Sequence, residues 1–244
     1  MQDFYGDTPF IIQTNKKNSR KSNENPTKIR MIFVLAVVFL AVIVAVSYYV
    51  FDRIFTVKTE QKTYFAVCFY EGTDRKEAES VKASLLLSGG SGYIVNDGKF
   101  LVFGAVYSDV LQAESVAKKQ QGEAFVKEVG WTGVSVKCSS YEDAKSIAEG
   151  LNGFDESLDF LIKLSLSLDL YEENDASVYL QIENISDKFY QFSKNIKNQK
   201  LADFFETCYN VVKNDFLEND EGKVSSRLKY VIHELIEFRS KVEI

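Results

Sequence analysis

One uncharged apolar run constrains this chain more than any other feature. It covers Met31–Phe51, and none of its 21 residues carries a charge. As an α-helix it would be about 31 Å long, which matches the hydrocarbon core of a bilayer. Arg30 and Asp52 bound the run, and Tyr48 and Tyr49 lie where an interfacial aromatic belt would form. The run predicts a transmembrane helix in contact with membrane lipid.

A cleaved signal peptide is the alternative interpretation of the same run. Its support is the sequence Ala45-Val46-Ser47, which has the small-x-small form of a cleavage site. We favour an uncleaved anchor, because apolar residues continue beyond that site and thirty residues precede the run.

Basic residues lie mostly before the run and predict its orientation. Only Arg53, Lys58 and Lys62 follow it closely. Those that precede it are Lys16, Lys17, Arg20, Lys21, Lys28 and Arg30. By the positive-inside rule, residues 1–30 form a disordered, basic cytoplasmic tail, and the chain after Asp52 is extracytoplasmic. Residues 52–62 are expected to be a linker.

Composition disfavours several classes of protein. The net charge of −6 argues against a nucleic-acid-binding protein. No Cys-x-x-Cys pair occurs, and the only histidine, His233, is expected at the surface with no nucleophile at a fixed spacing. We therefore predict no enzymatic activity, no metal and no cofactor. Cys68, Cys138 and Cys208 are expected to be free buried thiols, with a Cys68–Cys138 bridge as the alternative.

An internal repeat predicts the fold of the segment 63–138. Residues 65–81 and 100–116 align without a gap, and seven of the seventeen positions are identical. Each copy begins with a run typical of a strand and continues as a helix, with Asp74 or Asp109 near the switch. Further strands are expected at 93–95 and 132–137. The order β-α-β-β-α-β predicts an α+β, ferredoxin- or RNP-like domain with a four-stranded antiparallel sheet and both helices on one face.

The alternation of residues along the strands assigns the two faces of the predicted sheet. Phe65, Val67 and Phe69, with their repeat partners at 100, 102 and 104, are expected to face the helices. The other face is unusually apolar, and it is open unless another segment covers it. Its expected residues are Tyr64, Ala66, Cys68, Tyr70, Leu101, Phe103, Ala105 and Tyr107.

The segment 139–244 is predicted to be an α-helical bundle. A short helix is expected after Ser140, with a break at Asn152-Gly153, followed by a strongly apolar helix over 154–170. Apolar residues then recur at helical spacing in 178–196, 201–216 and 228–242. The short breaks between these segments favour antiparallel neighbours.

The segment 62–137 resembles the SPOR domain, the sporulation-related repeat of bacterial envelope proteins. The resemblance is carried by the tandem strand–helix repeat, by SGGSGY at 88–93 and by KFLVFGAVY at 99–107, behind one transmembrane helix. It implies that the sheet-face residues given above bind peptidoglycan glycan strands, and that division or sporulation envelope proteins are further partners. The alternative is a scaffold protein whose sheet face is covered, and which acts through that face or through its C-terminal helices.

Overall fold

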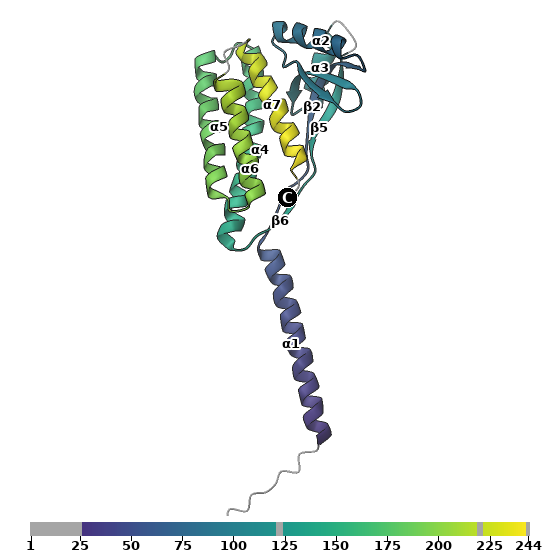
Figure 1. The fold of residues 1–244 in the computed structure, drawn as a ribbon, viewed down its shortest axis with the longest axis vertical. Coiled ribbons are helices and arrows are strands. Elements are labelled where there is room, and N and C mark those ends of the chain that lie inside the picture. The colour runs from purple at the N-terminus through teal and green to yellow at the C-terminus, as the bar shows by residue number, and fades with distance from the viewer. Residues whose placement is uncertain (1–25, 121–123, 219–221, 243–244) are drawn as a thin grey trace, which may run out of the picture. The chain divides into compact units, whose positions relative to one another are not determined.

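The computed structural model describes residues 26–120, 124–218 and 222–242, and the chain divides into two units after Val50 (Figure 1). The first unit contains most of helix α1 (Pro26–Ile54). Within α1, the span Arg30–Val50 contains an 18-residue stretch with a mean hydropathy of 2.9. By length and composition this helix can cross a membrane, so the expected N-terminal apolar helix is present.

The second unit is an α+β structure built on a four-stranded antiparallel sheet, as predicted. The strands lie in the order β3-β4-β2-β5. Their bounds are β2 (Lys62–Gly72), β3 (Tyr93–Asn96), β4 (Phe100–Tyr107) and β5 (Phe125–Trp131). Helix α2 (Arg75–Ser88) follows β2, and helix α3 (Val110–Lys119) follows β4. The carboxylates of Asp74 and Asp109 accept from first-turn N–H groups and cap these two helices.

The last strand of the sheet differs from the prediction. The fourth strand is β5, whereas residues 135–137 form β6 (Ser135–Lys137), which pairs with β1 (Thr56–Lys58) in a separate two-stranded ladder. The apolar pattern of β5 is interrupted by Lys127, Glu128 and Gly130, so the sequence did not predict this strand. β1 lies inside the expected linker. Because β6 does not pair with β2, Cys68 and Cys138 are not on neighbouring strands, and all three cysteines are free and buried.

Four helices follow the sheet in the described part of the chain. Helix α4 is continuous through the predicted break at Gly153, where a Cβ atom would lie 2.6 Å from the ring of Phe192. This glycine therefore permits close packing of two helices and does not end one. The bounds are α4 (Tyr141–Asp169), α5 (Asp175–Asn195), α6 (Gln199–Val211), its π-helical continuation η1 (Val212–Leu217) and α7 (Val224–Lys241).

The sheet lies between two helical layers. α2 and α3 pack on one face, while α7 contacts β4 and β5 from the other face and also packs on α4 and α6 (Figure 1). One core cluster runs from the sheet into the helices, through residues such as Phe103, Trp131 and Phe154. Residues 51–244 consequently form one compact unit.

Candidate functional site

The sheet face predicted to be open is covered. Tyr64, Ala66, Cys68, Leu101 and Phe103 share one face as expected, but each is at most 4% exposed. Their neighbours in the core cluster come from α4 and α7, so this face is the central core of the unit. The sequence left open whether another segment covers this face, and the C-terminal helices pack on it.

The other three predicted site residues, Tyr70, Ala105 and Tyr107, belong to the clusters on the α2 and α3 side. Two irregularities in the β2–β4 pairing explain the change of face. Val67 pairs with Ala105 and Cys68 with Phe103, so Gly104 has no opposite residue, and Phe69 has none on the other strand. Each bulge reverses the alternation beyond it. A Cβ atom at Gly104 would collide with the Phe69 ring, so the two bulges depend on each other.

His233 of α7 lies within the covered face, not at the surface where we expected it. Its ring stacks between Tyr93 and Phe103, with centroids 5.3 Å from each. Burial lowers the pKa of His233 to about 3, so the ring is neutral near pH 7. Its Nε2 atom has no hydrogen-bond partner among the described residues. The side chain is buried because α7 is enclosed on both sides, by the sheet and by the other helices.

Polar contacts tie the margins of this face to the helices. The Tyr64 hydroxyl donates to Asp159 of α4 at 2.7 Å, and Lys62 forms an ion pair with the same carboxylate at 2.9 Å. The Arg239 guanidinium lies 5.3 Å from the Trp131 ring, and Arg239 is 1% exposed. These contacts fix α4 and α7 on the sheet.

A small hollow lies between α7 and the sheet. Its volume is about 200 Å³, and Leu101 and Phe103 are the predicted site residues that line it. The other residues around it include Tyr93, Val95, Lys127, Val129, His233, Ile236 and Glu237. This volume is below the range of about 300–1,000 Å³ that is usual for ligand pockets.

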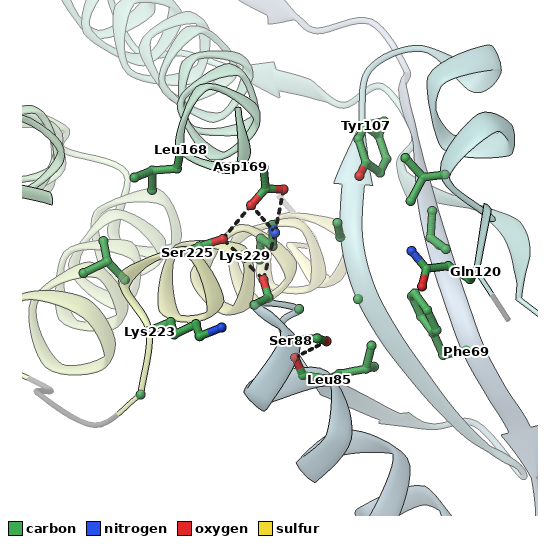
Figure 2. Close-up of a pocket in the computed structure, with 18 of the residues that line it drawn as sticks. Phe69, Leu85, Ser88, Tyr107, Gln120, Leu168, Asp169, Lys223, Ser225 and Lys229 are labelled. Carbon is green, nitrogen blue, oxygen red and sulfur yellow. Dashed lines mark hydrogen bonds and ion pairs between the residues drawn. The ribbon is translucent and has the colours of Figure 1, made fainter. Parts of the chain in front are cut away.

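A larger cleft lies on the opposite side of the sheet (Figure 2). Its volume is about 660 Å³, and it is bounded by α2, α3, the end of α4 and the start of α7. Its apolar part is formed by side chains of the sheet and of the helices on either side, Val67, Phe69, Ala105, Leu85, Val116 and Leu168. Of the residues predicted for glycan binding, Ala105 and Tyr107 line this cleft.

The polar end of the cleft is organised by an ion pair between a buried lysine and an exposed aspartate. Lys229 is 5% exposed, and its Nζ atom lies 2.7 Å from the Asp169 carboxylate and donates to the Gly89 carbonyl at 2.8 Å (Figure 2). The Ser225 hydroxyl donates to the same carboxylate at 2.8 Å. Tyr107, 8% exposed, also faces the cleft, and burial with the nearby Asp169 charge raises the pKa of its hydroxyl to about 12. The phenol therefore stays protonated at neutral pH.

The sequence pattern did not reveal the residues that organise the covered sheet face and the cleft on its other side. Tyr93, His233 and Trp131 are single aromatic residues outside the repeat, and Lys229 and Asp169 are sixty positions apart. The one available signal was the presence of Arg227, Lys229, His233 and Arg239 in a helix that also carries a full apolar stripe, because such a helix has little surface left for them.

No protein-family model, no curated protein and no solved structure matches this chain. Among the described residues, no group of three or more His, Cys, Asp or Glu side chains is placed to hold a metal ion. The resemblance to the SPOR domain and the lack of enzymatic activity stay predictions.

Proposed function

We propose that this chain is a membrane-anchored interaction protein of a bacterial envelope, built on a SPOR-like sheet domain that its own helices have closed. The order β2-α2-β3-β4-α3-β5 and the strand order of the sheet support the βαββαβ comparison. Helix α1 supports the anchor. The protein acts as a scaffold without enzymatic activity, and residues 1–30 lie in the cytoplasm.

The covering of the sheet by α7 carries this proposal. A glycan strand on the sheet would need the position that the His233 ring occupies between Tyr93 and Phe103. Displacing α7 would expose a buried apolar helix face, at a cost of about 25 cal/mol per Å². The intact unit therefore offers its outer surfaces, and not its sheet face, to partners.

Exposed apolar side chains are the features of those outer surfaces that suit protein partners. Leu87 of α2 is 79% exposed, Leu111 of α3 70% and Leu180 of α5 62%. Single exposed apolar residues are common on soluble proteins, so these positions serve as probes of contact and do not define an interface.

Glycan binding through a displaced α7 is the second candidate function. The observation in its favour is the set of buried polar atoms on α7 that lack partners among the described residues. They are Nε of Arg227, Nε2 of His233, Oε2 of Glu234, and Nε and Nη1 of Arg239. Each unpaired polar atom weakens the packing of α7 by the cost of its desolvation.

Co-sedimentation with purified glycan strands that lack stem peptides separates the two functions. The full chain in detergent should stay in the supernatant, and a photoreactive residue at Leu87, Leu111 or Leu180 should give discrete protein adducts in cells. Saturable sedimentation with the glycan, together with faster alkylation of Cys68 when glycan is present, would establish the second function instead.

Orientation is tested separately with a reporter fused after Ile244. The basic residues before the apolar run predict an extracytoplasmic reporter. Cytoplasmic reporter activity would reverse the topology and exclude contact with the cell wall.

A further inference from the structure

The cleft of Figure 2 has apolar walls because the two helices on that side of the sheet do not share a core. Helix α2 packs on the sheet through one cluster, around Leu85 and Val102. Helix α3 packs through another, around Val67 and Ala105. The gap between them, about 660 Å³, falls within the usual range of ligand pockets. An apolar group that covered these walls would gain free energy.

A tyrosine at the edge of this cleft lies mostly in solvent. Tyr171 is one of the residues that line the cleft, yet it is 95% exposed. The residue before it, Leu170, is 58% exposed. Tyrosine is a common anchor residue of protein interfaces, because its large ring is apolar and its hydroxyl is polar. The ring of Tyr171 therefore gains contacts only when a partner covers it.

The backbone at Tyr171 adopts a conformation that favours glycine. Its φ is 59°, and in the described part of the chain no other residue except glycine has a positive φ. The N–H groups of Tyr171 and Glu172 donate to the carbonyls of Leu168 and Ser167, the pattern of a helix end at which glycine is usual. A tyrosine here strains the backbone and adds almost no buried contact, so stability does not explain its presence.

Acidic side chains follow this tyrosine closely along the chain. Glu173 and Asp175 both line the cleft. Asp169 and Lys229 pair with each other, so Lys223 is the one further cation among the described lining residues. The two acids outnumber this lysine, and the edge of the cleft therefore favours a cationic group on a partner.

We propose that the cleft and Tyr171 form a docking site for a segment of a partner protein that carries an apolar side chain beside a basic one. The apolar side chain enters the cleft between α2 and α3. The ring of Tyr171 packs on the segment, and the basic side chain pairs with Glu173 and Asp175. This inference rests on the proposed scaffold function and adds the surface and the chemistry of the partner. An anionic lipid surface does not fit, because these acids would repel it.

Peptide titrations of the full chain in phosphatidylcholine nanodiscs, with empty nanodiscs as the blank, test the chemistry of the segment. The probe is acetyl-Lys-Leu-Leu-Lys-amide. One control peptide replaces both lysines by glutamate, and the other replaces both leucines by serine. We expect saturable binding of the probe with a dissociation constant below about 10 mM, and at least tenfold weaker binding of each control peptide.

Tyr171→Gly separates a role in docking from a role in folding. Glycine adopts the positive φ without strain, so the melting temperature should rise. The dissociation constant of the probe should nevertheless rise at least threefold, because the ring is lost.

A charge variant tests the acidic edge of the cleft. The double substitution Glu173→Gln with Asp175→Asn should raise the dissociation constant of the probe about three- to fivefold and remove most of its dependence on salt. The matched control is Glu183→Gln, which removes an exposed acid of α5 outside the cleft lining and should leave the constant unchanged. A thermal melt checks that each variant is folded.

Three results would overturn the docking site. One is the lack of saturable binding of the probe up to about 10 mM. Another is equal affinity for the lysine and glutamate peptides. The third is an unchanged dissociation constant in folded Tyr171→Gly.

A photoreactive residue at Tyr171 in cells separates this failure from that of the scaffold function. Protein adducts at Leu111 or Leu180, with none at Tyr171, would overturn the docking site and leave the scaffold function standing. The lack of adducts at every tested position would overturn both. Adducts at Tyr171 support the site when the lysine peptide competes with them.

Discussion

The two faces of one sheet are covered in different ways. α7 crosses the first face and joins it to α4 and α6, so strands and helices share one core cluster. α2 and α3 cover the second face as separate short helices, and a cleft of about 660 Å³ remains between their clusters. A sheet face is therefore covered more completely when the helix on it also packs on other helices, as α7 does on α4 and α6. How apolar the strand residues are does not decide the covering.

The difference also assigns different roles to the two faces. The face under α7 holds the residues that a resemblance to glycan-binding domains implicates, yet they serve as core. The face under α2 and α3 was expected to be the closed core, and it carries the larger cavity. Mutations can test this reversal, because the same substitution lowers the free energy of unfolding more at a buried residue than at an exposed one.

The largest expected effect is that of Phe103→Ala. Phe103 is 3% exposed and stacks on His233, so the substitution should lower the free energy of unfolding by about 3–5 kcal/mol. Urea unfolding of the full chain in detergent, followed by the fluorescence of the only tryptophan, Trp131, measures it. The comparison on the other face is Leu85→Ala, which should cost about 2 kcal/mol because the cleft lets its neighbours relax. A cost below about 0.5 kcal/mol for Phe103→Ala would indicate an exposed face.

A smaller effect is expected from the titration of His233. The pKa of this ring is lowered by burial to about 3, so the unfolded chain takes up a proton below about pH 6.5 while the folded chain does not. Its contribution to stability is present above pH 6.5 and is lost as the pH falls toward 3. The difference in unfolding free energy between pH 7.5 and pH 5 should therefore be smaller in His233→Phe than in the wild type. An equal difference in the two proteins would place His233 in contact with water.

The smallest effects compare two buried tyrosines. The Tyr64 hydroxyl donates to Asp159, so Tyr64→Phe should destabilise the unit by about 1–2 kcal/mol. The Tyr107 hydroxyl lacks a partner among the described residues, so Tyr107→Phe should change stability by less than about 0.5 kcal/mol. Urea midpoints of the two variants measure the contrast, and a larger loss from Tyr107→Phe would contradict the geometry of both sites.

Local patterns predicted the elements, and the remaining features depend on long-range packing. The repeat and the capping residues Asp74 and Asp109 predicted β2, α2, β4 and α3, because these signals act over a few residues. The change of face at Ala105 was not predictable, since the bulge at Gly104 depends on where the Phe69 ring packs. The burial of His233 depends on α7 crossing the sheet, a contact between residues more than one hundred positions apart.

For the candidate sites too, the sequence predicted what depends on local pattern and missed what depends on long-range packing. The sequence grouped Tyr64, Cys68 and Phe103 on one face correctly, because alternation along a regular strand is local. It did not reveal that α7 covers this face. It also did not reveal the cleft, whose polar end joins residues from α2, α4 and α7.

Alkylation of Cys68 in the native protein tests most directly whether the sheet face is closed. Cys68 is fully buried under the helices, and burial raises the pKa of its thiol. With N-ethylmaleimide at pH 7.5 and detection by mass spectrometry, wild-type Cys68 should stay unmodified until urea unfolds the chain. A cysteine introduced as Leu111→Cys, at an exposed position, should react at once. Reaction of native Cys68 at the rate of this exposed cysteine would contradict the closure of the face by α7, and with it the scaffold function.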